Sequence, residues 1–276
     1  MPWECEDKFM SVLTSDAVVL RTWPVMEADL VVSFFTRDYG RVRGIAKSAL
    51  KSRKRFGGAL EPMTVARAWF VQKPRQELVR LDQLEILRSP LSLPVDPIRM
   101  TALSFYAELL DEALPEHDPQ ETVFRLLLSV LEQTTSEQPW MPMTYFQLWM
   151  TRLLGLLPDF AHCTFCGEAL RASGFSAPDA LHGGDSGPLG NSRYSGVFFQ
   201  SYADGLFCSR HCGGGATALT ADSWTMAQRM LRAPVASFVG EEWPRRRGAD
   251  LRRFTLQILE RHLERRLRSA EALARL

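Results

Sequence analysis

The sequence predicts a protein of the α+β class, in which a small β-barrel precedes an α-helical domain that carries an inserted cysteine-rich module. Three observations support this prediction. Short apolar runs of strand length fill the first ninety residues, helical periodicity begins after Pro94, and two close cysteine pairs interrupt it between Cys163 and Cys212. The predicted divisions are 1–90 for the barrel, 91–160 and 216–276 for the helical domain, and 161–215 for the module.

Five strands are expected in the barrel. The runs are rich in β-branched and aromatic residues and read AVVLRTW, LVVSFFTR, RVRGIAK, TVARAWFV and ELVRLDQLEIL. Turn-forming sequences such as Asp38-Tyr39-Gly40 and Gly57-Gly58 separate them. Five strands in about 70 residues indicate a small closed barrel, and the commonest of these is the OB-fold, which binds single strands across an open face.

Helices follow the barrel. Asp96-Pro97 has the pattern of an N-cap followed by proline at the first helical position. Apolar residues then recur at helical spacing, as in Phe105, Tyr106, Leu109 and Leu110. Packing alone accounts for such stripes, although their aromatic residues could also line a groove for a partner peptide, and the sequence does not separate the two.

A basic segment lies at the predicted end of the third strand. Residues 39–60 hold seven Lys or Arg and no Asp or Glu, whereas the whole chain has a net charge of +1. A solvated loop without a partner is one interpretation, and a loop that contacts successive phosphates is the other. We favour nucleic-acid binding, with these candidate residues: Lys51, Arg53, Lys54 and Arg55, and as secondary candidates Arg41, Arg43 and Lys47.

Strand alternation refines this prediction. It places Arg41 and Arg43 on one face of the third strand, opposite Val42 and therefore outside the barrel core. Tyr39 and Phe56 are the aromatic residues that we expect to be partly exposed and able to stack on bases.

The cysteines predict a metal site. In Cys163-x-x-Cys166 the turn lets two thiolates reach one tetrahedral Zn²⁺, which makes the pair half of a site. Cys208 supplies the third ligand, and the fourth is either Cys212 or His211, of which we favour Cys212 because closely spaced thiols are seldom left free. Four protein ligands leave no open position, so one zinc ion per chain is expected to be structural and to hold the Gly- and Ser-rich insertion of residues 172–196.

A basic amphipathic helix is expected at about residues 250–270. Its arginines and Arg245 to Arg247 could form a second phosphate-binding patch, which would let one molecule hold two strands. The alternative is a solvated helix face on which arginines pair with Glu260 and Glu264.

Several functional classes find no support. The acidic start is unlike a signal peptide, and no apolar run reaches the ~18 residues of a membrane helix, so a soluble cytosolic protein is expected. The phosphate-loop, zinc-protease and serine-hydrolase motifs are absent, and His162 stands where a zinc deaminase needs proline before its first cysteine. A protein without enzyme activity is therefore expected, and an RNA-binding or transcription-associated module remains the alternative.

These segments together resemble one family. AVVLRTW, Glu27 to Asp29, FFTRDYGRVRGIAKSALKSRKRFGGALEPM, CTFCG, DGLFC and LRRFTLQILERHLERRLRS are similar, in this order, to the RecO family of bacterial recombination mediators. The insertion and the second cysteine pair depart from the usual family pattern in length and spacing. The resemblance implies an OB-fold, a helical domain and a zinc module. It also implies binding of single- and double-stranded DNA, strand annealing, contact with the C-terminal tail of single-strand binding protein, and RecA loading with RecR in the nucleoid.

Overall fold

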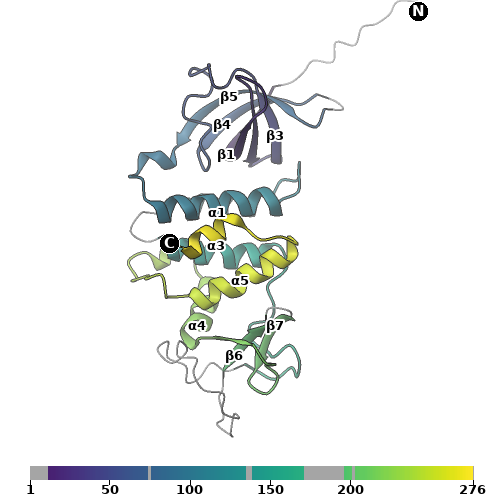
Figure 1. Cartoon of the computed structure of the whole chain (residues 1–276), viewed down its shortest axis with the longest axis vertical. Helices are drawn as coiled ribbons and strands as arrows, with labels where there is room; N and C mark the ends of the chain where they lie inside the picture. The colour runs from purple at the N-terminus through teal and green to yellow at the C-terminus, as the bar shows by residue number, and fades with distance from the viewer. Residues whose placement is uncertain (1–11, 74–75, 135–138, 171–195, 201–202, 276) are drawn as a thin grey trace, which may run out of the picture. The chain divides into compact units, whose positions relative to one another are not determined.

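The computed structural model describes residues 12–73, 76–134, 139–170, 196–200 and 203–275 (Figure 1). The chain forms two compact units. Unit 1 comprises residues 1–128 and 267–276, and unit 2 comprises residues 129–266. The predicted α+β class is confirmed, since unit 1 begins with five strands and both units contain helices. Most of the predicted insertion, residues 171–195, lies outside the described residues.

The five strands of unit 1 form a closed, OB-like barrel in the order β1-β2-β3-β5-β4. All neighbours are antiparallel except β3 and β5, which meet in parallel over two residue pairs. At this closure a Cβ on Gly44 would lie 2.8 Å from Val79 Cγ2, so only glycine allows the approach. The strands are β1 (Val12–Pro24), β2 (Leu30–Thr36), β3 (Gly40–Ala46), β4 (Val65–Val71) and β5 (Val79–Arg88).

Alternating side chains fill the barrel. Phe34 and Phe70 are buried at its centre and meet edge to face, with ring centroids 5.6 Å apart. Along β3 every second residue is buried, including Val42, which places Arg41 and Arg43 on the outer face as predicted. The alternating pattern of apolar and charged residues is enough to predict which face of this strand is buried, because a shift by one residue would bury both arginines.

Helices complete unit 1. Asp96 caps α1 (Pro97–Ala113) by accepting a 2.7 Å hydrogen bond from the Arg99 N–H, which confirms the predicted helix start. A short 3-10 helix, η1 (Pro90–Ser92), precedes it, and α2 (Glu121–Gln133) follows it, beginning in unit 1 and ending in unit 2. Glu108 of α1 then accepts hydrogen bonds from the first N–H groups of α6 (Arg268–Arg275).

Unit 2 combines helices with a small antiparallel sheet. The sheet has the order β7-β6-β8. The elements are α3 (Trp140–Leu153), β6 (Val197–Gln200), β7 (Ala203–Cys208), β8 (Thr217–Leu219), α4 (Ala221–Met230), η3 (Val235–Phe238) and α5 (Ala249–His262). Arg252 of α5 is buried and donates to Thr144 Oγ1 of α3 and to the Arg247 carbonyl, at 2.9 Å each. Its burial lowers the pKa of its guanidinium to about 10.

The prediction of one continuous helix over residues 250–270 is wrong. The helix α5 ends at His262, Glu264 has a left-handed backbone with φ of 53°, and α6 starts only at Arg268. A non-glycine residue in this conformation cannot continue a right-handed helix. None of the described helices combines the length and the apolar character that crossing a membrane requires.

Candidate nucleic-acid interface and metal centre

The basic loop that follows β3 is folded onto the barrel. Residues 47–60 form a series of turns, and Ala49, Phe56 and Ala59 are buried among the core side chains. Backbone hydrogen bonds fix the loop on two sides, because the Ser48 N–H donates to Asp29 Oδ1 at 2.7 Å and the Leu84 N–H donates to the Arg55 carbonyl at 3.0 Å. The loop thus presents its polar side chains from an anchored backbone.

Four of the predicted binding residues are exposed on this loop: Lys47, Lys51, Arg53 and Lys54. Within the described part of the chain, no ion pair includes any of them. A phosphate could therefore approach these four side chains without displacing an internal carboxylate. They form the cationic loop cluster.

Arg55 differs from these four residues. Its side chain is half-buried, donates from Nε to Ser52 Oγ at 3.0 Å and from Nη2 to the Lys47 carbonyl at 2.6 Å, and lies 5.0 Å over the Phe56 ring. Arg55 thus links two parts of the loop, at Lys47 and Ser52. Phe56 is 2% exposed, so the expectation that it is partly exposed is wrong, whereas Tyr39 is half-buried as expected. Phe56 is buried because the loop folds inward over the barrel core.

Arg41 and Arg43 face outward but are already paired. Arg41 Nη1 lies 3.3 Å and Arg43 Nε lies 2.5 Å from Glu116 Oε1, and Arg41 also contacts Asp111 at 3.6 Å. Arg41 Nε donates to the Leu114 carbonyl, 73 residues along the chain. Sequence reasoning missed these partners because such a distance leaves no local signal. Binding of phosphate by either arginine must compete with these carboxylates.

The first cysteine pair forms a tight turn before the predicted insertion. The Gly167 N–H donates to the Cys163 carbonyl at 2.9 Å, and the Cys163 N–H donates to the Glu168 carbonyl at 2.8 Å. The positive φ of Gly167, 70°, closes this turn. Cys163 is buried and Cys166 is exposed, with both thiols on the same turn.

The second ligand turn follows β7. Cys208 ends the strand, and its carbonyl accepts 3.0 Å hydrogen bonds from the N–H groups of both His211 and Cys212. The two turns are joined where the Thr164 N–H donates to the Leu206 carbonyl at 2.9 Å. A Cβ on Gly205 would lie 2.0 Å from Thr164 Oγ1, so this junction requires glycine.

Four ligand atoms converge at this junction. The thiols of Cys163, Cys166 and Cys208 and a ring nitrogen of His211 all lie within 4.8 Å of one another. Cys166 Sγ is 4.0 Å from Cys208 Sγ, which in turn is 3.2 Å from His211 Nδ1. A tetrahedral ion with Zn–S bonds of about 2.3 Å would separate two sulfurs by about 3.8 Å, so the residues fit such an ion.

The fourth member of the cluster is His211, whereas the sequence analysis favoured Cys212. Cys212 lies outside the cluster, and its Sγ donates to the Ser209 carbonyl at 3.3 Å. Burial raises the pKa of the Cys212 thiol. Because the turn after Cys208 is tight, His211, three residues after Cys208, comes close to the other ligand candidates. Cys212, four residues after Cys208, lies beyond them.

Cys163 is predisposed to ionise. Burial acts to raise its pKa, but hydrogen bonds from the backbone N–H groups of Cys166, Cys208 and Phe165 outweigh burial and lower the pKa to about 6. Such donors stabilise a thiolate, the form in which cysteine binds metal. The backbone of the two turns therefore favours the ligand state of this residue.

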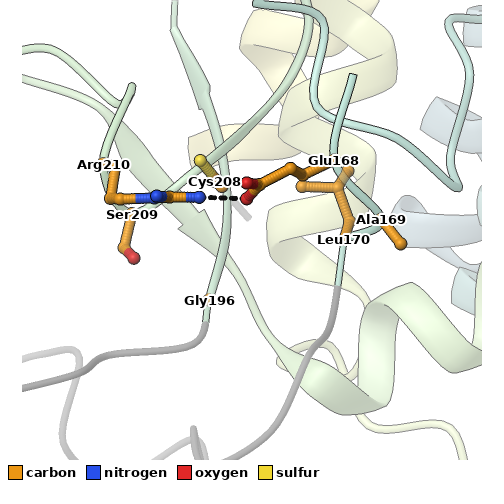
Figure 2. A pocket seen from close by; sticks show the side chains of 7 residues that line it. All are labelled: Glu168, Ala169, Leu170, Gly196, Cys208, Ser209 and Arg210. Atoms are coloured by element: carbon orange, nitrogen blue, oxygen red, sulfur yellow. Dashed lines mark hydrogen bonds and ion pairs between the residues drawn. The ribbon is translucent and has the colours of Figure 1, made fainter. Parts of the chain in front are cut away.

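A cavity of about 440 Å³ lies beside Cys208 and is lined by residues 168–170, which follow the first turn, by Gly196, and by residues 208–210 of the second turn. Figure 2 shows Glu168 after the first turn and Arg210 in the second turn directed toward each other, with Cys208 beside them. Their side chains form an ion pair that joins the two turns. Both side chains are largely exposed, so screening by solvent keeps this ion pair weak.

Two arginines near the C-terminus of unit 2 have acidic partners. Arg247 Nη2 lies 2.6 Å from Glu241 Oε2, and Arg261 pairs with Asp204. Whether these arginines also bind phosphate stays a prediction.

A small closed barrel with a cationic loop, joined to helices that carry a Cys₃His cluster, is typical of nucleic-acid-binding proteins that contain a structural metal module. Comparison with known proteins gives the family. Models of the N-terminal and C-terminal parts of recombination protein O match residues 10–90 and 94–271. The chain therefore belongs to the RecO family of DNA repair proteins.

Relatives support the match over most of the chain. The DNA repair protein RecO of Koribacter versatilis is 48% identical over 253 residues, which cover 92% of this chain and 94% of the relative. RecO of Anaeromyxobacter sp. strain K is 29% identical over 253 residues, with 91% of each chain covered. That of Syntrophobacter fumaroxidans is 33% identical over 165 residues, 59% of this chain and 65% of the relative.

Proposed function

We propose that this chain is a DNA-binding recombination mediator without enzyme activity, which binds single- and double-stranded DNA and anneals complementary strands. The observation that carries the proposal is the cationic loop cluster of Lys47, Lys51, Arg53 and Lys54, exposed and without carboxylate partners among the described residues. Its place on an OB-like barrel of a DNA repair family supports DNA as the ligand.

Annealing follows from charge neutralisation. Two single strands repel each other through their phosphates, and a protein that neutralises part of this charge lowers the barrier to pairing without any bond chemistry. Each phosphate contact releases a condensed counterion, so binding is independent of sequence and strongly dependent on salt. No nucleotide hydrolysis is needed for this step.

The family suggests the protein partners. We propose that the chain acts with RecR, contacts the C-terminal tail of single-strand binding protein, and helps to load RecA on DNA coated with that protein. This role places it in the cytoplasm, at the nucleoid.

We also propose one structural zinc ion per chain, bound by Cys163, Cys166, Cys208 and His211. Zinc fits this mixed thiolate and imidazole set better than calcium or magnesium, which prefer oxygen ligands. With four protein ligands, the ion would stabilise the junction of the two turns and have no position for a substrate.

The decisive test is annealing of complementary DNA strands coated with single-strand binding protein. The purified chain should accelerate duplex formation without ATP, and Lys47→Ala/Lys51→Ala/Arg53→Ala/Lys54→Ala should lose most of this acceleration. No acceleration by the wild-type protein would refute the proposal. Tighter binding to RNA than to DNA of the same sequence would instead support the RNA-binding alternative.

A further inference from the structure

We propose that Phe165, at the tip of the first ligand turn, is a stacking platform for an unpaired base, so that the metal module of unit 2 is a second contact site for single-stranded nucleic acid. The inference rests on the proposed nucleic-acid binding. It concerns an aromatic residue of unit 2, whereas the cationic loop cluster consists of Lys and Arg residues of unit 1.

Phe165 is unusually exposed for its size. Its side chain is 75% exposed although it lies between two metal-ligand candidates. Among the described residues of unit 2, Val239 is the only other large apolar side chain that is exposed. A single exposed apolar side chain is common on protein surfaces, so exposure alone assigns no role to Phe165; the way the ring is held and its surroundings do.

The ring is held in place from one side. It stacks on His211, with ring centroids 4.5 Å apart and an angle of 29° between the planes. The turn beneath it is fixed by the hydrogen bonds of Cys163 and Thr164. A base that stacks on the remaining surface of Phe165 would therefore cost little side-chain entropy, because the ring is already ordered.

The surroundings favour a base over a peptide. A peptide groove needs several neighbouring apolar side chains, whereas Phe165 is flanked along the chain by the exposed residues Thr164, Cys166 and Gly167 and stacks on His211. Glu168 interacts electrostatically with His211 and pairs with Arg210, which brings a cation near this pair of rings. A base needs one π-face, with hydrogen-bond donors beside it. Arg210 is 65% exposed, and its exposed ion pair with Glu168 can be exchanged for a phosphate at small cost.

His211 also affects the charge of the ligand cluster beside Phe165. Its Nδ1 faces Cys208 Sγ at 3.2 Å, so the ring edge that carries Nε2 is directed away from this thiol. Zinc held by three thiolates and one imidazole is one charge unit less negative than zinc held by four thiolates. A phosphate chain is therefore repelled less by this cluster than by one that used Cys212.

The test uses the full-length, zinc-loaded protein and a single-stranded oligonucleotide that carries 2-aminopurine, whose fluorescence falls when the base stacks. Phe165→Leu should weaken single-strand binding about five- to hundredfold and abolish the quenching, with zinc content and salt slope unchanged. Phe165→Trp should retain both, and Val239→Ala is the matched control. Affinity for a blunt duplex should not change in any variant.

Two results would overturn the inference: wild-type affinity and quenching in zinc-loaded Phe165→Leu, or an equal loss for duplex and single strand. If Phe165→Leu loses zinc, photo-crosslinking of wild-type protein to an oligonucleotide with 5-iodouracil decides. Crosslinks at the Phe165 peptide support the inference, and crosslinks confined to unit 1 overturn it. A wild-type protein that binds no DNA refutes the proposed function itself, whereas binding unaffected by Phe165 refutes only the second site.

Discussion

Removing the cationic loop cluster should flatten the salt dependence of DNA binding by a calculable amount. The change is Lys47→Ala, Lys51→Ala, Arg53→Ala and Lys54→Ala together, because these side chains are exposed and no ion pair of the described residues includes them. Each phosphate contact on a single strand contributes about 0.7 to the slope of log K against log salt, so four contacts contribute about 2.8. Between 50 and 200 mM salt, these contacts should weaken the wild type by about 50-fold, and the variant should lack this component.

The assay is fluorescence anisotropy of a labelled oligonucleotide at several salt concentrations. The matched control is Arg67→Gln with Arg80→Gln, because both arginines are exposed on the barrel and pair with Asp16 and Asp82 at 3.1 and 2.8 Å. Its slope should equal that of the wild type. A folded quadruple variant that keeps the wild-type slope would contradict the assignment of the loop as the phosphate site.

Three further predictions concern stability and metal content. His211→Ala should lower zinc occupancy in metal analysis whereas Cys212→Ser should keep one zinc per chain, and the reverse result would restore Cys212 as the ligand. Phe56→Ala should destabilise the barrel by about 3–5 kcal/mol in urea unfolding because the ring is 2% exposed; a change below 1 kcal/mol would argue against its burial. Gly205→Ala should weaken zinc retention against a chelator because its Cβ would meet Thr164 Oγ1 at 2.0 Å and its φ is 109°, and unchanged retention would contradict this close packing.

The features that the sequence predicted correctly depend on local chemistry. Strand alternation is a property of neighbouring residues, so Val42 could be placed inside the barrel and Arg43 outside it. The start of α1 could be predicted because Asp96 and Pro97 act on the first helical turn only. Cys163 and Cys166 could be paired because their turn is short.

The features that the sequence did not predict depend on tertiary packing or on the geometry of a single backbone turn. Glu116 pairs with both Arg41 and Arg43 from a segment more than seventy residues away, which no local pattern reveals. Phe56 follows three cations and so resembles a surface residue, yet the loop folds inward at that position. The choice between His211 and Cys212 depends on the tightness of the turn after Cys208, which spacing alone does not determine.

The structure divides the seven predicted cations into two groups with different physical roles. Arg41, Arg43 and Arg55 already have internal partners, so binding a phosphate would require each of them to break an existing interaction. We therefore expect each of them to contribute less to DNA affinity than a residue of the cationic loop cluster. The proposed mediator would also have to release the paired strands, and weak, salt-sensitive contacts from a few exposed side chains would allow this release more readily than seven fully engaged cations.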